Sequence, residues 1–349
     1  MNKYEPLGRK LDLRSGRVDL SHGSGGRAMA RLIADVFHKA FDNDFLRAGN
    51  DQSAFDIGGG RMVMTTDGYV VSPLFFPGGD IGDLAVNGTI NDIAMAGAKP
   101  LYMSASFIIE EGFPLADLKK IADAMGAAAR EAGVPIVTGD TKVVERGKAD
   151  GVFVSTTGVG VVAAGLDLSA EKARVGDRVL VSGTLGDHGI AVMSVRENMT
   201  FETDLMSDSA ALHELVAAML EGGGAGIRVM RDPTRGGLAA TLNELAQQSR
   251  VGFRIEEEAI PVRPAVAAAC ELLGLDPLNV ANEGKLVAIV APEAASSLLA
   301  AMRAHPLGRD AVDIGQVVED DHRFVQMTTS FGGGRIVDWL SGEQLPRIC

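Results

Sequence analysis

The chain has 349 residues, a length that predicts two domains, each large enough to bury a core of its own. Hydrophobic residues make up 46% of the sequence and charged residues 23%, which is the composition of a soluble globular protein. The formal net charge of −13 argues against a nucleic-acid binder, which needs a basic face, and against an anionic membrane surface as partner. The excess of carboxylates serves solubility or, where carboxylates cluster, holds a divalent cation.

Two cysteines, Cys270 and Cys349, are too few for a disulfide framework and indicate reduced thiols in a cytoplasm. Cys270 lies in a run with helical spacing and is expected to be a small buried hydrophobe. Cys349 is the last residue, a place where a structural cysteine can hardly be packed, so we expect a carrier thiol. The first residues do not resemble a signal peptide, and no apolar run reaches the ~18 residues that cross a bilayer. We therefore expect a cytoplasmic protein.

The first half of the chain alternates between strand and helix patterns. Residues 1–20 are polar and are expected to form an extension with little core of its own. Helical spacing of apolar residues predicts helices over residues 27–41, 81–96 and 115–132. Apolar or β-branched runs predict strands over residues 61–66, 102–109, 135–138 and 152–162. These elements predict an N-terminal α/β domain over residues 21–165.

The second half repeats the alternation after a polar boundary within residues 164–176. Strands are expected over residues 178–183, 227–230, 252–256, 286–291 and 312–318. Helices are expected over residues 208–221, 237–248, 264–273 and 293–305. We infer a C-terminal α/β domain over residues 166–330. Residues 331–349 contain three consecutive glycines and little periodicity, which predicts a mobile tail.

Several aspartates stand beside glycines or at the ends of predicted elements. They are Asp51, Asp67, Asp92, Asp140 and Asp232. If these carboxylates converge, their hard oxygen atoms can hold Mg²⁺, and such ions bridge the phosphates of a nucleotide during phosphoryl transfer. Any one of them taken singly is better explained as a turn former or a helix cap.

Other motifs narrow the chemistry. No GxxxxGK[ST] sequence occurs, which disfavours a P-loop nucleotide site, and no closely spaced His or Cys pairs suggest zinc. Lys142, beside Asp140, can neutralise phosphate oxygens or form an ordinary surface ion pair. Glu283 precedes a strongly apolar strand and can be a base, a metal ligand or part of a simple turn.

A set of short motifs, in order along the chain from about residue 20 to its end, resembles the HypE family of hydrogenase maturation proteins. These motifs are His22-Gly-Ser-Gly-Gly26, Pro73-Leu-Phe-Phe-Pro-Gly-Gly79, Asn91-Asp92, Gly139-Asp-Thr-Lys142, Asp232-Pro-Thr-Arg-Gly-Gly237, Asn282-Glu-Gly-Lys285 and Pro346-Arg-Ile-Cys349. The terminal Pro346-Arg-Ile-Cys349 is the most specific of them. The resemblance implies the two-domain α/β fold of the aminoimidazole ribonucleotide synthetase superfamily, with a flexible C-terminal tail.

The resemblance also implies an ATP-dependent carbamoyl dehydratase, a lyase. From the resemblance, we expect the carbamoyltransferase HypF to load a carbamoyl group on Cys349. Phosphorylation of the amide oxygen and loss of phosphate then leave a thiocyanate. The cyano group passes to iron on the HypC–HypD scaffold, for the nickel–iron hydrogenase centre. A homodimer with ATP bound near the subunit interface is implied as well.

Residue by residue, the resemblance assigns three roles. Metal binding is assigned to Asp51, Asp67, Asp92 and Asp232. The ATP site adds Asp140 and Lys142 to the same four carboxylates, with Mg²⁺ as the ion. Catalytic roles are assigned to Cys349, to Glu283 as first choice for the general base, and to Asp92.

One position departs from the superfamily pattern, because Asn50 stands where a second aspartate before Asp51 is common. Its carbonyl oxygen can still serve as a ligand, so the departure concerns the metal shell. Two alternatives to the dehydratase stay open at this point. One is a small-molecule kinase or synthetase of the same superfamily, and the other is a non-catalytic maturation scaffold.

Overall fold

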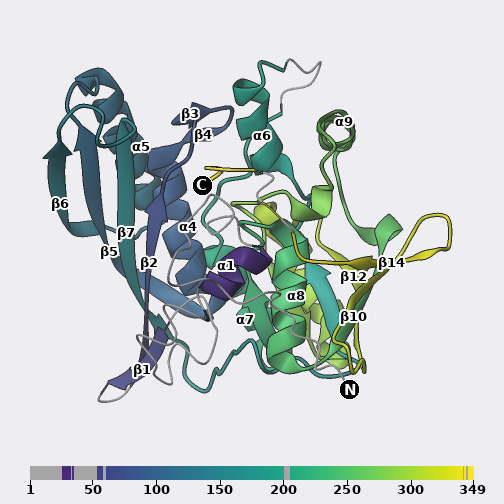
Figure 1. Cartoon of the computed structure of the whole chain (residues 1–349). Coiled ribbons are helices and arrows are strands. Elements are labelled where there is room, and N and C mark those ends of the chain that lie inside the picture. Colours follow the sequence, from purple (N-terminus) through teal and green to yellow (C-terminus); the bar gives the residue numbers. More distant parts are fainter. Residues whose placement is uncertain are drawn as a thin grey trace.

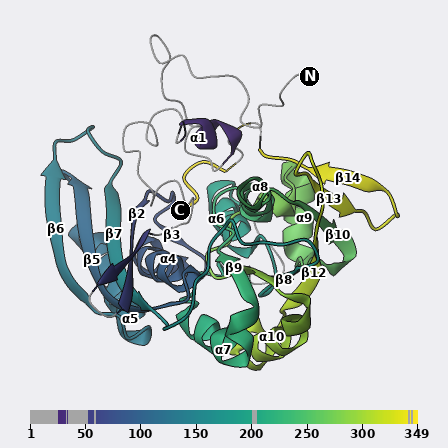
Figure 2. The same cartoon turned by 90° about the horizontal axis from the view of Figure 1, so that it is seen from below.

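A computed structural model describes residues 26–32, 34, 53–57, 60–199, 205–340, 342 and 345–349. Asn50 and Asp51 lie outside the described residues. Figure 1 shows two α/β units side by side, the first in blue and the second in green to yellow, with the C-terminus between them. The view from below in Figure 2 places the C-terminus in the same position. The last residue therefore lies where the two units meet.

The first unit is built on a five-stranded sheet in the order β1-β2-β7-β5-β6. Its strands are β1 (Ser53–Ile57), β2 (Gly60–Tyr69), β5 (Ala98–Glu110), β6 (Ile136–Val144) and β7 (Val152–Val162). Only β5 and β6 run parallel among these neighbours, and α5 (Leu115–Glu131) connects them. The short strands β3 (Phe75–Phe76) and β4 (Gly79–Asp80) pair with each other, and α1 (Arg27–Leu32) precedes the sheet in the chain.

Helix α4 (Ile81–Met95) is the element around which both units pack. Its N-cap, Asp80, accepts hydrogen bonds from the N–H groups of Gly82 and Asp83 at 2.7 and 3.4 Å, and Asp83 completes a capping box. The helix is buried on nearly all sides, because the sheet and α5 cover one flank while elements of the second unit cover the other. Polar side chains on α4 are consequently held at the junction.

The second unit is built on a seven-stranded sheet in the order β14-β13-β10-β12-β8-β11-β9. Its strands are β8 (Arg178–Val181), β9 (Ile227–Arg231), β10 (Gly252–Glu256), β11 (Val287–Val290), β12 (Val312–Val318), β13 (Val325–Thr328) and β14 (Gly334–Val337). Its helices are α6 (Asp187–Arg196), α7 (His213–Gly223), α8 (Gly237–Ser249), α9 (Pro264–Leu273) and α10 (Pro292–Ala304). Short 3-10 helices occupy Gly224–Gly226, Glu257–Ala259, Pro277–Asn279 and Pro306–Gly308.

Both faces of this second sheet are buried. Along β8, Val179 and Val181 belong to one core cluster together with residues of α8, whereas Leu180 belongs to another with residues of α7 and α10. Successive side chains of a strand point to opposite faces, so the apolar run of β8 supplies both cores. The sheet is thereby fixed between two helical layers and can hold loops at its ends in place.

The elements predicted from the sequence are largely observed, with differences that have physical causes. The predicted helix over residues 208–221 begins at His213, because Asp208 forms a buried ion pair with Lys285 at 2.9 Å and does not cap the helix. Helix α6 was not predicted, since its residues are buried all round and carry no polar stripe. Within the tail predicted to be mobile, β14 pairs with β13. In the described parts of the chain, no helix is long and apolar enough to cross a membrane.

Candidate active site

A cavity of about 180 Å³ lies where the two units and the C-terminus meet. The first unit contributes Asp67 and Tyr69 from β2 and Asp92 from α4. The second unit contributes the loop before α8 and the loop before β11. The full lining is Thr66, Asp67, Gly68, Tyr69, Gly88, Asp92, Asp232, Thr234, Arg235, Glu283 and Cys349. Motifs that lie far apart in the sequence therefore share one small polar chamber.

Glu283 is the most deeply buried acid in this cavity, with only 3% of its surface exposed. Its main chain is fixed on both sides, since its N–H donates to Asp208 Oδ1 at 3.0 Å and its carbonyl oxygen accepts from Asn91 Nδ2 at 3.2 Å. Among the described residues, its Oε1 atom has no hydrogen-bond partner. Burial first, and then the charges of Asp232 and Asp208, raise the pKa of the Glu283 carboxyl well above its usual value.

The two loops of the second unit are tied together by Asn282, which is fully buried. Its side-chain amide donates to the carbonyl oxygens of Pro233 and Val280, each at 3.0 Å, and its oxygen accepts from the N–H of Gly186 at 2.8 Å. Both N–H donors and the oxygen of this buried amide thus have main-chain partners. The loop with Arg235 and the loop with Glu283 are positioned as one piece.

Cys349 enters the cavity as the end of a docked segment. The N–H groups of Val70 and Ser72 donate to the carbonyl oxygens of Cys349 and Arg347 at 3.1 and 3.0 Å. Ile348, which is 3% exposed, packs in the same hydrophobic cluster as residues of β2 and α4. A terminal thiol was expected to be hard to pack, but main-chain pairing beyond the end of β2 gives it a defined seat.

The surroundings of the thiol decide its charge. Burial and then the neighbouring Glu283 carboxyl, which accepts a hydrogen bond from the thiol, raise the pKa of Cys349, while the Arg235 guanidinium opposes them. The pKa of Arg235 is raised in turn, first by Cys349. The docked thiol is therefore neutral at physiological pH and is a poor nucleophile in this position.

The carboxylates of the first unit are held by hydroxyl groups. Tyr69 donates from its hydroxyl to Asp67 Oδ2 at 3.1 Å, and Thr65 donates from its hydroxyl to Asp92 Oδ2 at 2.6 Å. Burial raises the pKa of Asp67, whereas the Tyr69 hydrogen bond and the charge of Arg235 lower it.

Comparison with known proteins decides the family. Family models described as the N-terminal and the C-terminal domain of AIR synthase related protein match residues 49–162 and 174–328. Carbamoyl dehydratase HypE of Bradyrhizobium diazoefficiens is 80% identical over 341 residues, which cover 98% of this chain and 99% of that protein.

The chain belongs to the HypE family of carbamoyl dehydratases.

Solved structures of the HypE family agree with this fold. One crystal structure of a HypE–HypF complex is similar with a TM-score of 0.84 and 50% identity, covering 88% of this chain and 99% of that chain. A crystal structure of hydrogenase maturation protein HypE in complex with ATP has a TM-score of 0.80 and 49% identity, with 95% and 100% covered. The expected superfamily fold is confirmed.

Five of the residues assigned from the HypE resemblance come together in the cavity: Asp67, Asp92, Asp232, Glu283 and Cys349. Two others do not. Asp140 and Lys142 are exposed on β6 and pair with each other at 2.6 Å. Because β5 and β7 separate β6 from β2, this strand lies at the far edge of the sheet.

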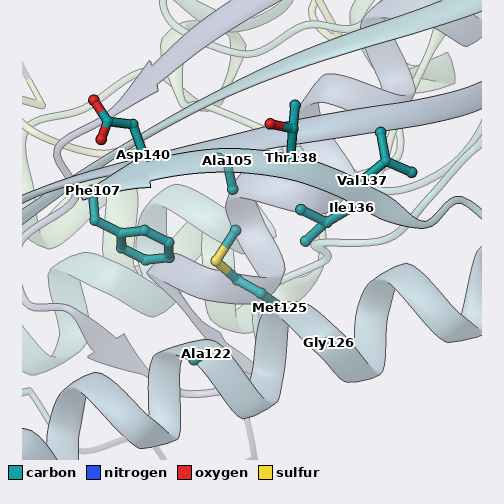
Figure 3. Close-up of a pocket in the computed structure, with 10 residues that line it drawn as sticks. Ala105, Phe107, Ala122, Met125, Gly126, Ile136, Val137, Thr138 and Asp140 are labelled. Atoms are coloured by element: carbon teal, nitrogen blue, oxygen red, sulfur yellow. The ribbon is translucent and has the colours of Figure 1, made fainter.

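A second hollow, of about 630 Å³, lies between β5, β6 and α5. Phe107 and Met125 point into it, while Asp140 at its rim is directed away from the helix (Figure 3). Phe107, Met125 and the small residues of α5 give this hollow an apolar floor. This hollow shares no lining residue with the cavity that holds Cys349, so Asp140 is not part of that cavity.

The oxygen donors of the cavity are of the type that a hard cation prefers. Asp67, Asp92 and Asp232 offer the carboxylate oxygens that Mg²⁺ prefers, and a bound cation would favour the ionised form of Asp67, whose pKa burial raises. Within the described ranges, no group of three or more His, Cys, Asp or Glu residues is arranged so that it could hold a metal ion. The residue types fit Mg²⁺, with Asp51 outside the described part of the chain.

Sequence reasoning missed Tyr69 and Arg235, which also line the cavity. Arg235 lies inside the Asp232-Pro-Thr-Arg-Gly-Gly237 motif, so its charged side chain in a glycine-rich turn was a usable signal. Tyr69 ends an ordinary strand, and the signal for it was only its separation of two residues from Asp67 on the same face.

Proposed function

We propose that this carbamoyl dehydratase acts on cargo carried by its own terminal thiol: an S-carboxamide on Cys349 becomes a thiocyanate at the expense of ATP. The product supplies the cyanide ligand of the iron centre in nickel–iron hydrogenase. One observation carries the proposal. The sulfur of Cys349 and the buried carboxyl of Glu283 face each other in a cavity lined by three aspartates.

The reaction requires the carboxamide oxygen to leave and both nitrogen protons to be removed. Phosphorylation by ATP converts that oxygen from a poor leaving group into part of a good one. Loss of one N–H proton gives an imidate phosphate. Loss of the second N–H proton, with cleavage of the C–O bond and departure of phosphate, gives the carbon–nitrogen triple bond. The carboxamide oxygen leaves in the phosphate and the two nitrogen protons leave separately, so the atoms balance.

Glu283 is proposed to take protons from the carboxamide nitrogen. Its raised pKa brings its basicity closer to neutral pH, as a general base requires. Its Oε1 atom has no competing hydrogen bond among the described residues, so it can accept from the cargo. The loop that carries it is held by Asp208 and Asn91, which keeps the carboxyl aligned with the sulfur.

The aspartates are proposed to face the phosphates. Asp67, Asp92 and Asp232 would hold Mg²⁺, which supplies neutralisation of phosphate charge when it is bound. Arg235, which lies close enough to Cys349 to influence its charge, is positioned to stabilise negative charge on the phosphorylated cargo. Burial of the cavity between two units keeps water away from the activated intermediate, which would otherwise hydrolyse.

A homodimer is proposed to complete the ATP site. Cross-strand pairing puts Met64, Tyr102 and Ile108 on one face of the first sheet, where their exposed fractions are 46%, 52% and 46%. A second copy of the chain packed on this face would cover apolar surface that water otherwise contacts. Asp140 and Lys142 are exposed on the neighbouring edge strand, and we assign them to ATP bound near this subunit interface.

Loading and delivery are proposed to take place outside the cavity. A relative forms a complex with HypF, and we propose HypF as the carbamoyl donor of this chain and the HypC–HypD scaffold as the cyanide acceptor. All of these steps are placed in the cytoplasm. Because main-chain hydrogen bonds hold the docked segment with its thiol at the cavity, residues 345–349 must withdraw for each exchange. The mobile tail inferred from the glycines provides for that movement.

Intact mass of the protein after incubation with HypF and carbamoyl phosphate, with and without Mg-ATP, tests the proposal. We expect a carbamoyl adduct that loses the mass of one water only when ATP is present. Cys349→Ala should carry no adduct, whereas the matched control Cys270→Ser should behave as the parent does. An adduct that ATP leaves unchanged contradicts the mechanism. Undiminished ATP turnover in Cys349→Ala would instead favour a small-molecule kinase.

A further inference from the structure

We infer that Arg196 is a positioning residue. It holds the C-terminal segment in the cavity by donating hydrogen bonds to the main-chain carbonyl groups of that segment. Arg196 is the last residue of α6 and is half-buried. Its Nη1 donates to the carbonyl oxygen of Pro346 at 2.6 Å, and its Nη2 donates to that of Arg347 at 2.9 Å. Neither contact exists unless the tail is inserted.

The same guanidinium also grips the surface on which the tail lies. Its Nε donates to the carbonyl oxygen of Ser72 at 3.0 Å, while the N–H of Ser72 donates to the carbonyl oxygen of Arg347. A planar guanidinium can bind three carbonyls at once, because its donors are fixed in a fork. Arg196 therefore connects the tail to the segment after β2. In the same segment, the N–H of Val70 donates to the carbonyl oxygen of Cys349.

Helix α6 gives the guanidinium a rigid base. Residues Asp187–Ser194 of this helix are buried, and Val192 and Met193 belong to the hydrophobic cluster that contains Ile348. His188, two turns earlier, lies with Nε2 at 2.8 Å from the carbonyl oxygen of Ile348. One helix thus engages three consecutive carbonyl groups of the tail, those of Pro346, Arg347 and Ile348.

These contacts stabilise the inserted state and contribute nothing to the withdrawn state. Hydrogen bonds from a charged donor that are lost together shift such an equilibrium by about 10- to 100-fold. The proposed reaction needs the inserted state for dehydration and the withdrawn state for loading. The role of Arg196 in dehydration rests on the proposed function, whereas its role in seating the tail does not.

The decisive experiment measures how fast iodoacetamide alkylates Cys349, by peptide mass spectrometry on the full chain without any carbamoyl donor. We expect Arg196→Ala to raise the rate by about 10- to 100-fold, in proportion to the larger withdrawn population. Arg196→Lys, which keeps the charge but loses the fork, should give an intermediate rate. Arg254→Ala, a change at an exposed arginine on β10, should leave the rate unchanged. Cys270, which is 1% exposed, reports unfolding within the same sample.

A second measurement starts from enzyme already carbamoylated by HypF and follows one turnover with Mg-ATP. Loading should be retained in Arg196→Ala, while dehydration slows by a factor similar to the gain in alkylation.

If Cys349 of Arg196→Ala is alkylated at the parent rate, the positioning role is wrong. An equal rise of the alkylation rate in Arg254→Ala would contradict the positioning role as well. Should Arg196→Ala fail to fold, Arg196→Gln, which keeps a planar NH₂ donor, answers the same question by the same rate. If Arg196→Ala is alkylated faster but the parent enzyme shows no dehydration, the proposed function is wrong and the role of Arg196 in seating the tail remains supported.

Discussion

The side-chain amide of Asn91 donates to the carbonyl oxygen of Glu283 at 3.2 Å and thereby joins the central helix of the first unit to the acid loop of the second. The same amide donates to Ala210, and its oxygen accepts from the N–H of Leu212 at 2.8 Å. A fully used amide at a domain junction fixes the distance between the units. The position of the proposed base therefore depends on how the two units pack.

Replacing Glu283 with Gln should separate stability from activity. The raised pKa of Glu283 means that its contribution to stability is greatest below its ordinary pKa of 4.5 and declines as pH rises through the folded value. The isosteric amide removes this penalty, so the free energy of unfolding at pH 8, measured with urea, should rise. Dehydration in a single turnover should fall by about 10²- to 10⁴-fold. Full activity in the variant would contradict the assignment of the base.

Gly284 has a steric reason to be glycine. A Cβ atom there would lie 1.7 Å from the carbonyl oxygen of Asp208, which is main chain and cannot move aside cheaply. We expect Gly284→Ala to lower the free energy of unfolding by roughly 3 kcal/mol and to displace the neighbouring Glu283. Gly60→Ala is the matched control, because no atom of another described residue, its chain neighbours aside, lies within 4 Å of a Cβ at that position. Equal urea midpoints for both variants would refute this explanation.

His188 should make the protein sensitive to acid. Burial lowers its pKa below 6.5, against the opposing influence of Asp208 and of the hydrogen bond to Ile348. The unfolded chain therefore takes up the proton at a higher pH than the folded one, and stability falls as pH drops through 6.5. Urea unfolding between pH 8 and pH 5 should show a smaller loss for His188→Gln than for the parent. His322→Gln, at an exposed histidine, should follow the parent curve.

The exposed sheet face predicts a dimer that a single charge can disrupt. Tyr102→Glu should convert a dimer to a monomer in sedimentation velocity, since a carboxylate would be buried without a partner in the interface. ATP turnover should fall with it if Asp140 and Lys142 act at that interface. Leu272→Glu is the control, because Leu272 on α9 is 79% exposed and lies in the other unit. A parent protein that sediments as a monomer would exclude this interface.

The sequence was most informative where local signals were strong. The helix over Pro264–Leu273 was predicted at its observed bounds, because Pro264 begins it and Gly274, in the left-handed region, ends it. The strand over Gly252–Glu256 was likewise predicted at its bounds. The start of α7 was misplaced because a buried ion pair between Asp208 and Lys285 is a tertiary feature that leaves no local pattern.

The same distinction holds for the site. Five of the assigned residues share the cavity, but their catalytic and metal-binding roles stay predictions. The separation of Asp140 from Asp67 follows from strand order, which a single sequence does not reveal. The seat of the tail was unpredictable for another reason. It is made by main-chain groups such as the N–H of Val70 and the carbonyl oxygen of Cys349, and these carry no residue-type signature.

The walls of the small cavity come from β2 and α4 on one side and from two loops of the second unit on the other. Most residues of each hydrophobic cluster come from one unit, although Val192, Met193 and Ala281 of the second unit join the cluster of the first sheet, whereas the cavity depends wholly on the junction between the units. Mild denaturant should therefore loosen this junction before either core melts. The midpoint for loss of turnover is expected to fall at a lower urea concentration than the midpoint for loss of secondary structure, so this enzyme would inactivate while still folded.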